Sequence, residues 1–353
     1  MYAAAAALFA ILIAGAVTVT WSRESRNLGF ESSPINSAYV STYEVLNTFP
    51  HDPDSFTQGL TFDEHGTLYE SDGLYGRSGV RIVEVHTGKS KTRTTNERSV
   101  RATSLVVCCL LVPFLSPLTR LFFWSLSLLA SPNLPLEPHL QHFGEGLQVV
   151  GQRLLQLTWK EQVLNEYKLP ELTKVTTHRM PCAPTCREGW GLAYDEAANK
   201  LYMTDSTDKL FTLNPATLEP IGAPKQIYDP RLGRPINGVN ELEYVDGELW
   251  GNVFPMYQGT ASECVVRINA TDATVIGWLD LRGLLGKQRQ AVRANSHNYV
   301  LNGIAYHHTS GRLYVTGKQW DHMYQIRVKP AEASQQTAAY VHGACSLGAV
   351  GRG

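Results

Sequence analysis

The sequence predicts an all-β fold made of five similar sheets, preceded by an N-terminal hydrophobic helix. Three observations support this: one hairpin pattern occurs five times, its copies are spaced like the units of a repeat protein, and the first twenty residues are almost wholly apolar. The chain has 353 residues, 43% of them hydrophobic, and a formal net charge of −1. It is long enough to bury a full core, and its charge gives no field that would attract nucleic acid.

The repeated pattern has the same order of features in each copy. A polar or acidic residue, usually beside a glycine, precedes a Leu or Ile, and a short alternating strand follows. A turn rich in Gly, Asp, Asn or His then leads to a second strand that opens with Leu and usually an aromatic residue. Alternation on both sides of such a turn predicts a β-hairpin. The five anchor residues are Leu60, Leu147, Leu192, Leu242 and Ile304.

The spacing of these anchors indicates a propeller. They lie 87, 45, 50 and 62 residues apart, and a propeller blade is about 40–50 residues long. The long first spacing contains residues 99–138, an apolar, leucine-rich segment without the hairpin pattern. We interpret 99–138 as an insertion foreign to the fold; a second transmembrane helix is the alternative, which Pro113, Pro117 and Arg120 disfavour. Its removal brings the first spacing to about 47 residues.

Five units of similar length predict a five-bladed β-propeller over residues 43–330. Repeated four-stranded sheets around an axis leave only short, protected edges, which is how propellers avoid edge-to-edge association. A pair of β-sandwiches or a barrel is the alternative. The sequence has no Rossmann or P-loop glycine pattern that would favour a nucleotide-binding α/β fold.

The segments outside the repeats have their own predictions. Residues 1–21 are apolar enough to cross a bilayer, so we expect a signal-anchor or signal peptide there, with a buried N-terminal helix as the alternative. Residues 22–42 would be a linker, and the tail at 331–353 would be disordered. These features predict entry into the secretory pathway, either in the ER or Golgi membrane with the repeat domain in the lumen or as a secreted protein. The sequon Asn269-Ala-Thr271 would then be available for glycosylation.

Two of the six cysteines are close in the sequence. Cys182 and Cys186 have three residues between them, and no second Cys/His pair has the spacing of a zinc site. In an oxidising compartment a loop disulfide is favoured over two free thiols.

The polar residues before each first strand indicate a site. In a propeller these positions gather at one mouth of the central channel, and here they are Gln58, Glu145, Trp190, Asn240 with Glu241, and Asn302. They predict a polar, aromatic-walled pit with one well-placed carboxylate, whose flanking glycines let a ligand come close. A lone acid at an apolar mouth would have a raised pKa that suits proton transfer. The alternative is that these groups cap strands and satisfy one another.

Six motifs in one order resemble a known family. "FTQGL", "FGEGL", "EGWGL", "NELE", "LNGIA" and "VTGKQW" resemble the plant-type (papaya-type) glutaminyl cyclases, also called glutaminyl-peptide cyclotransferases. The resemblance covers about Tyr43–Val328, apart from the segment 99–138. It implies a five-bladed propeller. It also implies an acyltransferase that converts the N-terminal glutamine of peptides or proteins to pyroglutamate and releases ammonia.

The resemblance also implies roles for particular residues. Glu145 matches the family's essential glutamate and would carry protons, while Asn240, Gln58 and Lys318 would bind substrate and stabilise charge. The matching aromatic residues would hold the glutaminyl side chain and exclude water. They are Phe56, Phe143, Trp159 and Trp190.

The resemblance implies neither a catalytic metal nor a cofactor, and it is compatible with a non-catalytic divalent ion trapped in the channel. The expected partners are peptides with N-terminal glutamine, and we expect a monomer. The chain departs from the family at Phe254, where a tryptophan is usual, and in the lengthened "PMYQGTASE" that follows. The insertion could also disrupt a strand of the first blade.

Two other functions remain as alternatives. A metal-dependent lactonase-type hydrolase would need several carboxylates or amides converging on calcium, and only Glu145 and Glu241 are well placed. A non-catalytic propeller serving as a binding platform would tolerate changes at Glu145.

Overall fold

The described residues form mainly antiparallel β-sheets with few, short helices. The computed structural model describes residues 39–96, 142–186, 188–254 and 262–345, which belong to a unit that begins at Asn36. The predictions for residues 1–21, for most of the linker at 22–42 and for the segment 99–138 lie outside the described residues. The first strand begins at Val40, three residues before the predicted start of the domain at 43.

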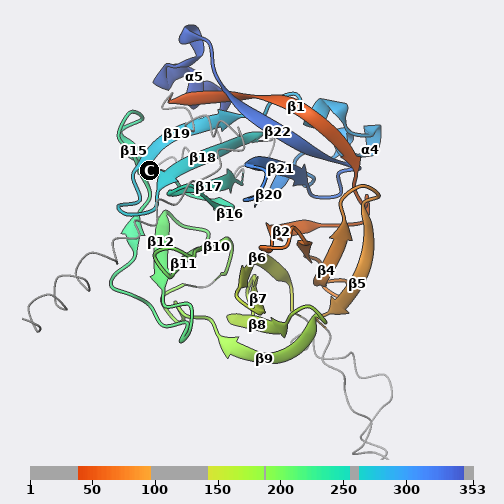
Figure 1. The fold of residues 1–353 in the computed structure, drawn as a ribbon. Coiled ribbons are helices and arrows are strands. Elements are labelled where there is room, and N and C mark those ends of the chain that lie inside the picture. The colour runs from red at the N-terminus through yellow and green to blue at the C-terminus, as the bar shows by residue number, and fades with distance from the viewer. Residues whose placement is uncertain (1–38, 97–141, 187, 255–261, 346–353) are drawn as a thin grey trace, which may run out of the picture. The chain divides into compact units, whose positions relative to one another are not determined.

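Three four-stranded antiparallel sheets follow one another along the chain (Figure 1). The first contains β2 (Thr57–Phe62), β3 (Leu68–Asp72), β4 (Gly79–Glu84) and β5 (Lys89–Thr95). The second contains β6 (Gly144–Val150), β7 (Arg153–Thr158), β8 (Val163–Lys168) and β9 (Thr173–Arg179). The third contains β10 (Leu192–Asp195), β11 (Lys200–Thr204), β12 (Lys209–Leu213) and β13 (Lys225–Gln226). A two-stranded sheet of β14 (Tyr228–Asp229) and β15 (Arg234–Pro235) comes next.

An eight-stranded sheet contains the remaining strands in two groups of four. One group is β16 (Val239–Val245), β17 (Glu248–Val253), β18 (Cys264–Asn269) and β19 (Val275–Asp280). The other is β20 (Leu301–His307), β21 (Arg312–Gly317), β22 (His322–Pro330) and β1 (Val40–Pro50). Each group is antiparallel within itself, and the two are joined by a short parallel pairing of β1 with β19 at Val40 and Ser41.

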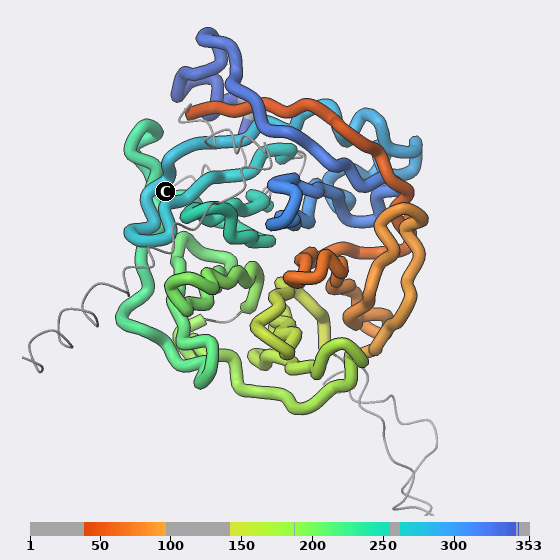
Figure 2. Tube along the Cα trace, viewed as in Figure 1, coloured from red at the N-terminus to blue at the C-terminus, as the bar shows by residue number. Residues whose placement is uncertain are grey.

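The strand from the N-terminal side therefore completes the last group of strands. β1 pairs with β22 along nearly its whole length, from Ser41 opposite Pro330 to Pro50 opposite His322. Figure 2 shows this red segment running alongside the blue C-terminal strand. The pairing holds together residues that are almost three hundred positions apart in the sequence.

The hairpin prediction is confirmed at all five copies. The pairs β2–β3, β6–β7, β10–β11, β16–β17 and β20–β21 are antiparallel neighbours. Each anchor lies in the first strand of its pair, and all five are at most 1% exposed. These first strands lie innermost in Figure 1, whereas β5 and β9 lie on the outside.

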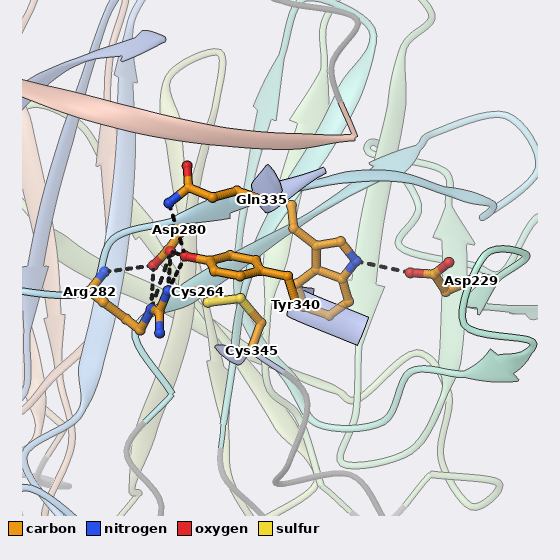
Figure 3. Close-up of a disulfide and its surroundings, with 8 residues drawn as sticks. Asp229, Cys264, Asp280, Arg282, Gln335, Tyr340 and Cys345 are labelled. Atoms are coloured by element: carbon orange, nitrogen blue, oxygen red, sulfur yellow. Dashed lines mark hydrogen bonds and ion pairs between the residues drawn. A yellow bond between two sulfur atoms is a disulfide. The ribbon is translucent and has the colours of Figure 1, made fainter. Parts of the chain in front are cut away.

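Residues 331–345 are ordered, in contrast to the disorder expected for the tail at 331–353. They form the 3₁₀ helix η4 (Ala333–Gln335) and the helix α5 (Ala338–Ala344), and Cys345 forms a disulfide with Cys264 on β18. Val341 is buried in the same core as β18, and Tyr340 bonds to Asp280 (Figure 3). A disulfide across 81 residues and an apolar helix face fix this segment, and neither has a signature in the repeat pattern.

The other short elements lie between β19 and β20. They are the 3₁₀ helix η3 (Leu285–Lys287) and the helix α4 (Gln290–Ala294). No helix within the described ranges is long and apolar enough to cross a membrane. Cys182 and Cys186 form a disulfide, as expected for an oxidising compartment.

Candidate active site

Four of the predicted mouth residues lie on β-bulges at the start of inner strands. The strand register shifts at Gln58 on β2, at Glu145 on β6, at Asn240 on β16 and at Asn302 on β20. A bulge adds one residue to a strand and re-aims its side chain out of the normal alternation. The same β-bulge therefore recurs in four of the five copies of the sequence pattern. It turns these polar side chains away from the apolar packing between the sheets.

The glycines beside these residues have a role in packing. A Cβ at Gly146 would lie 2.2 Å from the carbonyl oxygen of Trp190. A Cβ at Gly144 would lie 2.3 Å from Nε2 of Gln156. The glycines are therefore required for close packing of the inner strands around Glu145.

Glu145 is held at one end of a chain of side-chain amides. Nδ2 of Asn302 donates to Oε1 of Gln58 over 3.0 Å, and Nε2 of Gln58 donates to Oε1 of Glu145 over 2.8 Å. The second carboxyl oxygen, Oε2, is buried and has no hydrogen-bond partner among the described residues. One oxygen is thus fixed in position, and the other is a buried acceptor without a donor.

The charges around Glu145 adjust its proton affinity. Burial raises the pKa of Glu145 well above its usual range, and the Lys318 ammonium opposes this shift. The carboxylates of Glu188 and Glu161 raise the pKa further. Burial also lowers the pKa of Lys318 to about 8, against the attraction of Glu145. A carboxyl group and an amine with pKa values shifted toward each other suit proton transfer near neutral pH.

The aromatic residues form a continuous series of contacts with Lys318 in the middle. On one side, the Phe143 ring lies 5.4 Å from Trp159 and 6.3 Å from Phe56. Lys318 Nζ lies 5.1 Å from the Phe56 ring and 4.8 Å from the Phe254 ring. On the other side, the Phe254 ring lies 5.9 Å from Trp190. Phe254 therefore occupies part of the aromatic wall, although this position was the doubtful one in the sequence.

Asn240 provides a second buried acceptor. It is 4% exposed, and its Oδ1 has no hydrogen-bond partner within the described part of the chain. Its main chain packs closely against Gly191, which follows Trp190, because a Cβ at Gly191 would lie 2.3 Å from the Asn240 carbonyl oxygen. Buried polar atoms without partners are rare in folded proteins, so Oδ1 of Asn240 is a candidate contact for a ligand or a bound water molecule.

Comparison with known proteins places this chain in a family. The family model described as glutamine cyclotransferase matches residues 12–107 and 128–328. The chain belongs to the glutamine cyclotransferase family. The resemblance found in the sequence is thereby confirmed.

Individual members of the family agree with this assignment. The glutaminyl-peptide cyclotransferase of Arabidopsis thaliana is 33% identical over 308 residues, which are 87% of this chain and 77% of the relative. The crystal structure of Myxococcus xanthus glutaminyl cyclase matches with a TM-score of 0.61 and 26% identity, and it covers 84% of this chain and 100% of that chain. The interruption of the family match at 108–127 falls within the segment 99–138, interpreted above as an insertion.

This glutamine cyclotransferase has further residues at the site that the sequence did not indicate. Glu161 accepts hydrogen bonds from the Tyr75 hydroxyl over 2.8 Å and from the Phe143 amide over 3.2 Å. Glu188 accepts a hydrogen bond from Nε1 of Trp190 over 3.2 Å. Glu161 lies two residues after Trp159, and Glu188 lies two residues before Trp190. The one signal in the sequence was therefore that each acid is close to a predicted aromatic residue of the site.

The site thus contains the elements for moving protons in a region largely screened from water. A fixed carboxyl group, an ammonium group and amide side chains lie among aromatic rings. Across the described ranges, no group of three or more His, Cys, Asp or Glu side chains is arranged to hold a metal ion.

Proposed function

We propose that this protein is a glutaminyl-peptide cyclotransferase, which converts the N-terminal glutamine of peptides to pyroglutamate and releases ammonia. Membership of the glutamine cyclotransferase family supports this reaction. The observation that carries the assignment of the site is the buried Glu145 carboxyl group, tethered through Oε1 to Gln58 and unpaired at Oε2.

The reaction needs one group that first accepts and then donates a proton. The neutral α-amine of the substrate attacks the carbon of its own side-chain carboxamide, and a nitrogen–carbon bond forms. The Glu145 carboxylate takes the proton that the attacking nitrogen releases and passes it to the departing amide nitrogen. The carbon–nitrogen bond of the carboxamide then breaks, ammonia leaves, and the lactam remains on the peptide. The raised pKa of Glu145 suits both steps.

The remaining groups match the substrate's polar atoms. Two acceptors of the site, Oε2 of Glu145 and Oδ1 of Asn240, are buried without partners among the described residues. The substrate carries two nitrogen donors that could bond to them, its amine and its carboxamide. The Lys318 ammonium supplies positive charge for the oxyanion of the tetrahedral intermediate, as donors in an oxyanion hole do. The aromatic rings would enclose the glutaminyl side chain and exclude water.

We also propose that the four-stranded groups form a five-bladed β-propeller. Contacts run from β2 to β6, β10, β16, β20 and back to β2 among the first strands of the five hairpins. β1 joins the last group from the N-terminal side, which supports closure between the two ends of the unit. In this arrangement the bulged residues meet at one end of a central channel.

The assay is the release of ammonia from a peptide with N-terminal glutamine, followed together with the mass loss of cyclisation. Glu145→Gln is expected to abolish the activity because the amide cannot carry a proton. Glu243→Gln is the matched control: Glu243 is also a buried carboxyl on an inner strand, and it accepts a hydrogen bond from the Tyr306 amide that glutamine can keep. Activity retained in Glu145→Gln would contradict the proposal.

We propose that the reaction uses no metal or cofactor, since one carboxyl group can carry both proton transfers. Cyclisation that persists after chelation supports this, whether or not the channel holds a non-catalytic divalent ion. Ester or lactone hydrolysis that the chelator abolishes would instead favour the lactonase-type alternative. A folded protein without either activity would favour the binding platform. We further propose that the protein acts as a monomer, which sedimentation of the active protein would test.

The disulfides support a location in the secretory pathway. The bonds Cys182–Cys186 and Cys264–Cys345 require an oxidising compartment to persist. Asn269, the acceptor of the sequon, lies at the end of β18, and its Oδ1 accepts a hydrogen bond from the Thr271 amide. We propose a lumenal or secreted catalytic unit, which protease protection in microsomes and a mobility shift on deglycosylation would test.

A further inference from the structure

Tyr75 lies on the loop between β3 and β4, next to the candidate active site. It stands between two residues in the left-handed region, Leu74 with φ 74° and Gly76 with φ 76°. The amide of Ser78 closes the turn onto the Leu74 carbonyl over 2.8 Å. The turn is therefore tight, and it places the Tyr75 side chain in one position relative to the strands.

Several contacts fix this loop to the site. The Tyr75 ring lies 5.3 Å from the Phe143 ring in an edge arrangement, and the hydroxyl donates to Glu161 over 2.8 Å. The Ser78 hydroxyl accepts a hydrogen bond from the amide of Gly144, the residue before Glu145, over 2.9 Å. The loop is thus bonded to the same segment that carries the proposed catalytic carboxyl group.

Exposure increases stepwise from Glu145 to Tyr75. Glu145 is 3% exposed, Phe143 is 8% exposed and Tyr75 is 46% exposed. Tyr75 has the largest exposed fraction among the tyrosine, phenylalanine and tryptophan residues that the structure describes as exposed. The Tyr75 ring is packed along one edge, its hydroxyl is hydrogen-bonded, and a large part of it is open to solvent. Such a ring is already ordered, so a ligand that binds to it loses little free energy in fixing its position.

We propose that Tyr75 forms the subsite for the residue that follows the N-terminal glutamine and favours large apolar or aromatic side chains there. The inference rests on the proposed cyclotransferase function. The glutaminyl group must reach Glu145, which is buried, so the rest of the peptide leaves the site toward its solvent-exposed side. Tyr75 lies on that side, and its ring packs against the Phe143 ring. The expected ligand is therefore a peptide in which the second side chain packs against the ring.

The test compares peptides of the form Gln-Xaa-Ala amide, with Xaa as Gly, Ala, Leu or Phe. The wild-type protein is expected to have lower KM values for the Leu and Phe peptides than for the Gly peptide. Tyr75→Ala is expected to lower kcat/KM for the Phe peptide by about twofold to tenfold, through KM, the range that corresponds to one aromatic contact. The loss for the Gly peptide is expected to be smaller.

Two further variants distinguish the contribution of the Tyr75 ring from that of its hydroxyl and from the general effect of removing an exposed tyrosine. Tyr75→Phe keeps the ring on Phe143 and is expected to keep the preference for Phe. Tyr228→Ala removes another exposed tyrosine, 40% exposed on β14 of the separate two-stranded sheet, and is expected to change none of the four values. Thermal unfolding of each variant shows whether it is folded.

Each outcome has a definite meaning. An equal loss for all four peptides in Tyr75→Ala, or no loss, would overturn the subsite while leaving the cyclotransferase function in place. Loss of the preference in Tyr75→Phe would overturn the role of the ring. A wild-type protein that is folded but cyclises none of the peptides would overturn the proposed function, and the subsite with it.

Discussion

Gln58 donates a hydrogen bond from Nε2 to Oε1 of Glu145 over 2.8 Å, between side chains that lie 87 positions apart in the sequence. Both residues sit on bulges, and Asn302 in turn donates to Oε1 of Gln58 over 3.0 Å. Because Asn302 occupies the acceptor of the Gln58 amide, the amide must present its nitrogen to Glu145. The carboxyl group therefore has one fixed oxygen and one oxygen left for substrate.

Replacement of Lys318 by methionine is expected to change the pH profile of kcat in a specific direction. The Lys318 ammonium lowers the pKa of Glu145, so its loss raises that pKa further and moves the acid limb of the profile to higher pH. An alkaline limb near the Lys318 pKa of about 8 should disappear. Loss of one charge-stabilising donor is expected to lower kcat by about 10²-fold.

The profile is measured at saturating peptide, so that it reports on groups in the complex. Lys287→Met is the control, since Lys287 is an exposed lysine whose Nζ lies 5.8 Å from the Tyr324 ring and which is not among the charges that shift the pKa of Glu145. An acid limb that stays in place or moves to lower pH in Lys318→Met would show that Lys318 does not act on the proton carrier.

The strands were predictable from the sequence, whereas the bulges were not. The five anchors could be found because apolar residues alternate in each first strand, and a buried leucine or isoleucine marks the same point in every copy. Positions such as Gln58 and Glu145 could be grouped by their place before the anchor. The directions of their side chains could not be predicted, because a bulge depends on the register between two strands and not on the residues of one strand.

Contacts between segments that are far apart in the sequence are the second feature that could not be predicted. Cys345 was assigned to a disordered tail because nothing near it in the sequence indicates its partner Cys264, 81 residues away. The role of Tyr75 was hidden for the same reason, since its partners Phe143 and Glu161 lie beyond the segment at 99–138. Only the fold brings these residues together.

Gly146→Ala is expected to lower both stability and activity. The added Cβ would lie 2.2 Å from the Trp190 carbonyl oxygen and 2.8 Å from the Leu192 amide nitrogen, both of them backbone atoms that cannot move independently. Overpacking of this kind costs about 1–3 kcal/mol. The backbone would have to move apart between Glu145 and Trp190, both of them predicted site residues. We therefore expect kcat to fall by more than the decrease in folded protein explains.

Thermal unfolding and kcat at a temperature where both proteins are folded give the two measurements. Gly286→Ala is the matched control, because a Cβ there meets nothing within 4 Å and its φ is not in the left-handed region. If Gly146→Ala were as stable and active as Gly286→Ala, β6 and β10 would not be as closely packed at this point as described.

Glu145→Gln is expected to stabilise the fold at neutral and alkaline pH while it abolishes activity. The pKa of Glu145 is raised in the folded protein above the ordinary value of 4.5, so below pH 4.5 the carboxyl is neutral in both states and affects stability little. As pH rises, the unfolded chain ionises first, and the wild-type protein loses stability until the folded-state pKa is passed. Glutamine does not ionise, and its Oε1 can still accept the hydrogen bond from Gln58.

The difference in melting temperature between Glu145→Gln and wild type should therefore be near zero at pH 4 and positive at pH values above 4.5, where the unfolded chain ionises before the folded protein does. Lys318 faces a neutral side chain in both proteins as long as Glu145 is protonated, so it does not reverse this trend. Glu196→Gln, at an exposed turn, is the control for the replacement of one glutamate by glutamine at the surface. A melting-temperature difference that is constant with pH would mean that Glu145 has no raised pKa in the folded protein, and the proton carrier would then have to be sought elsewhere.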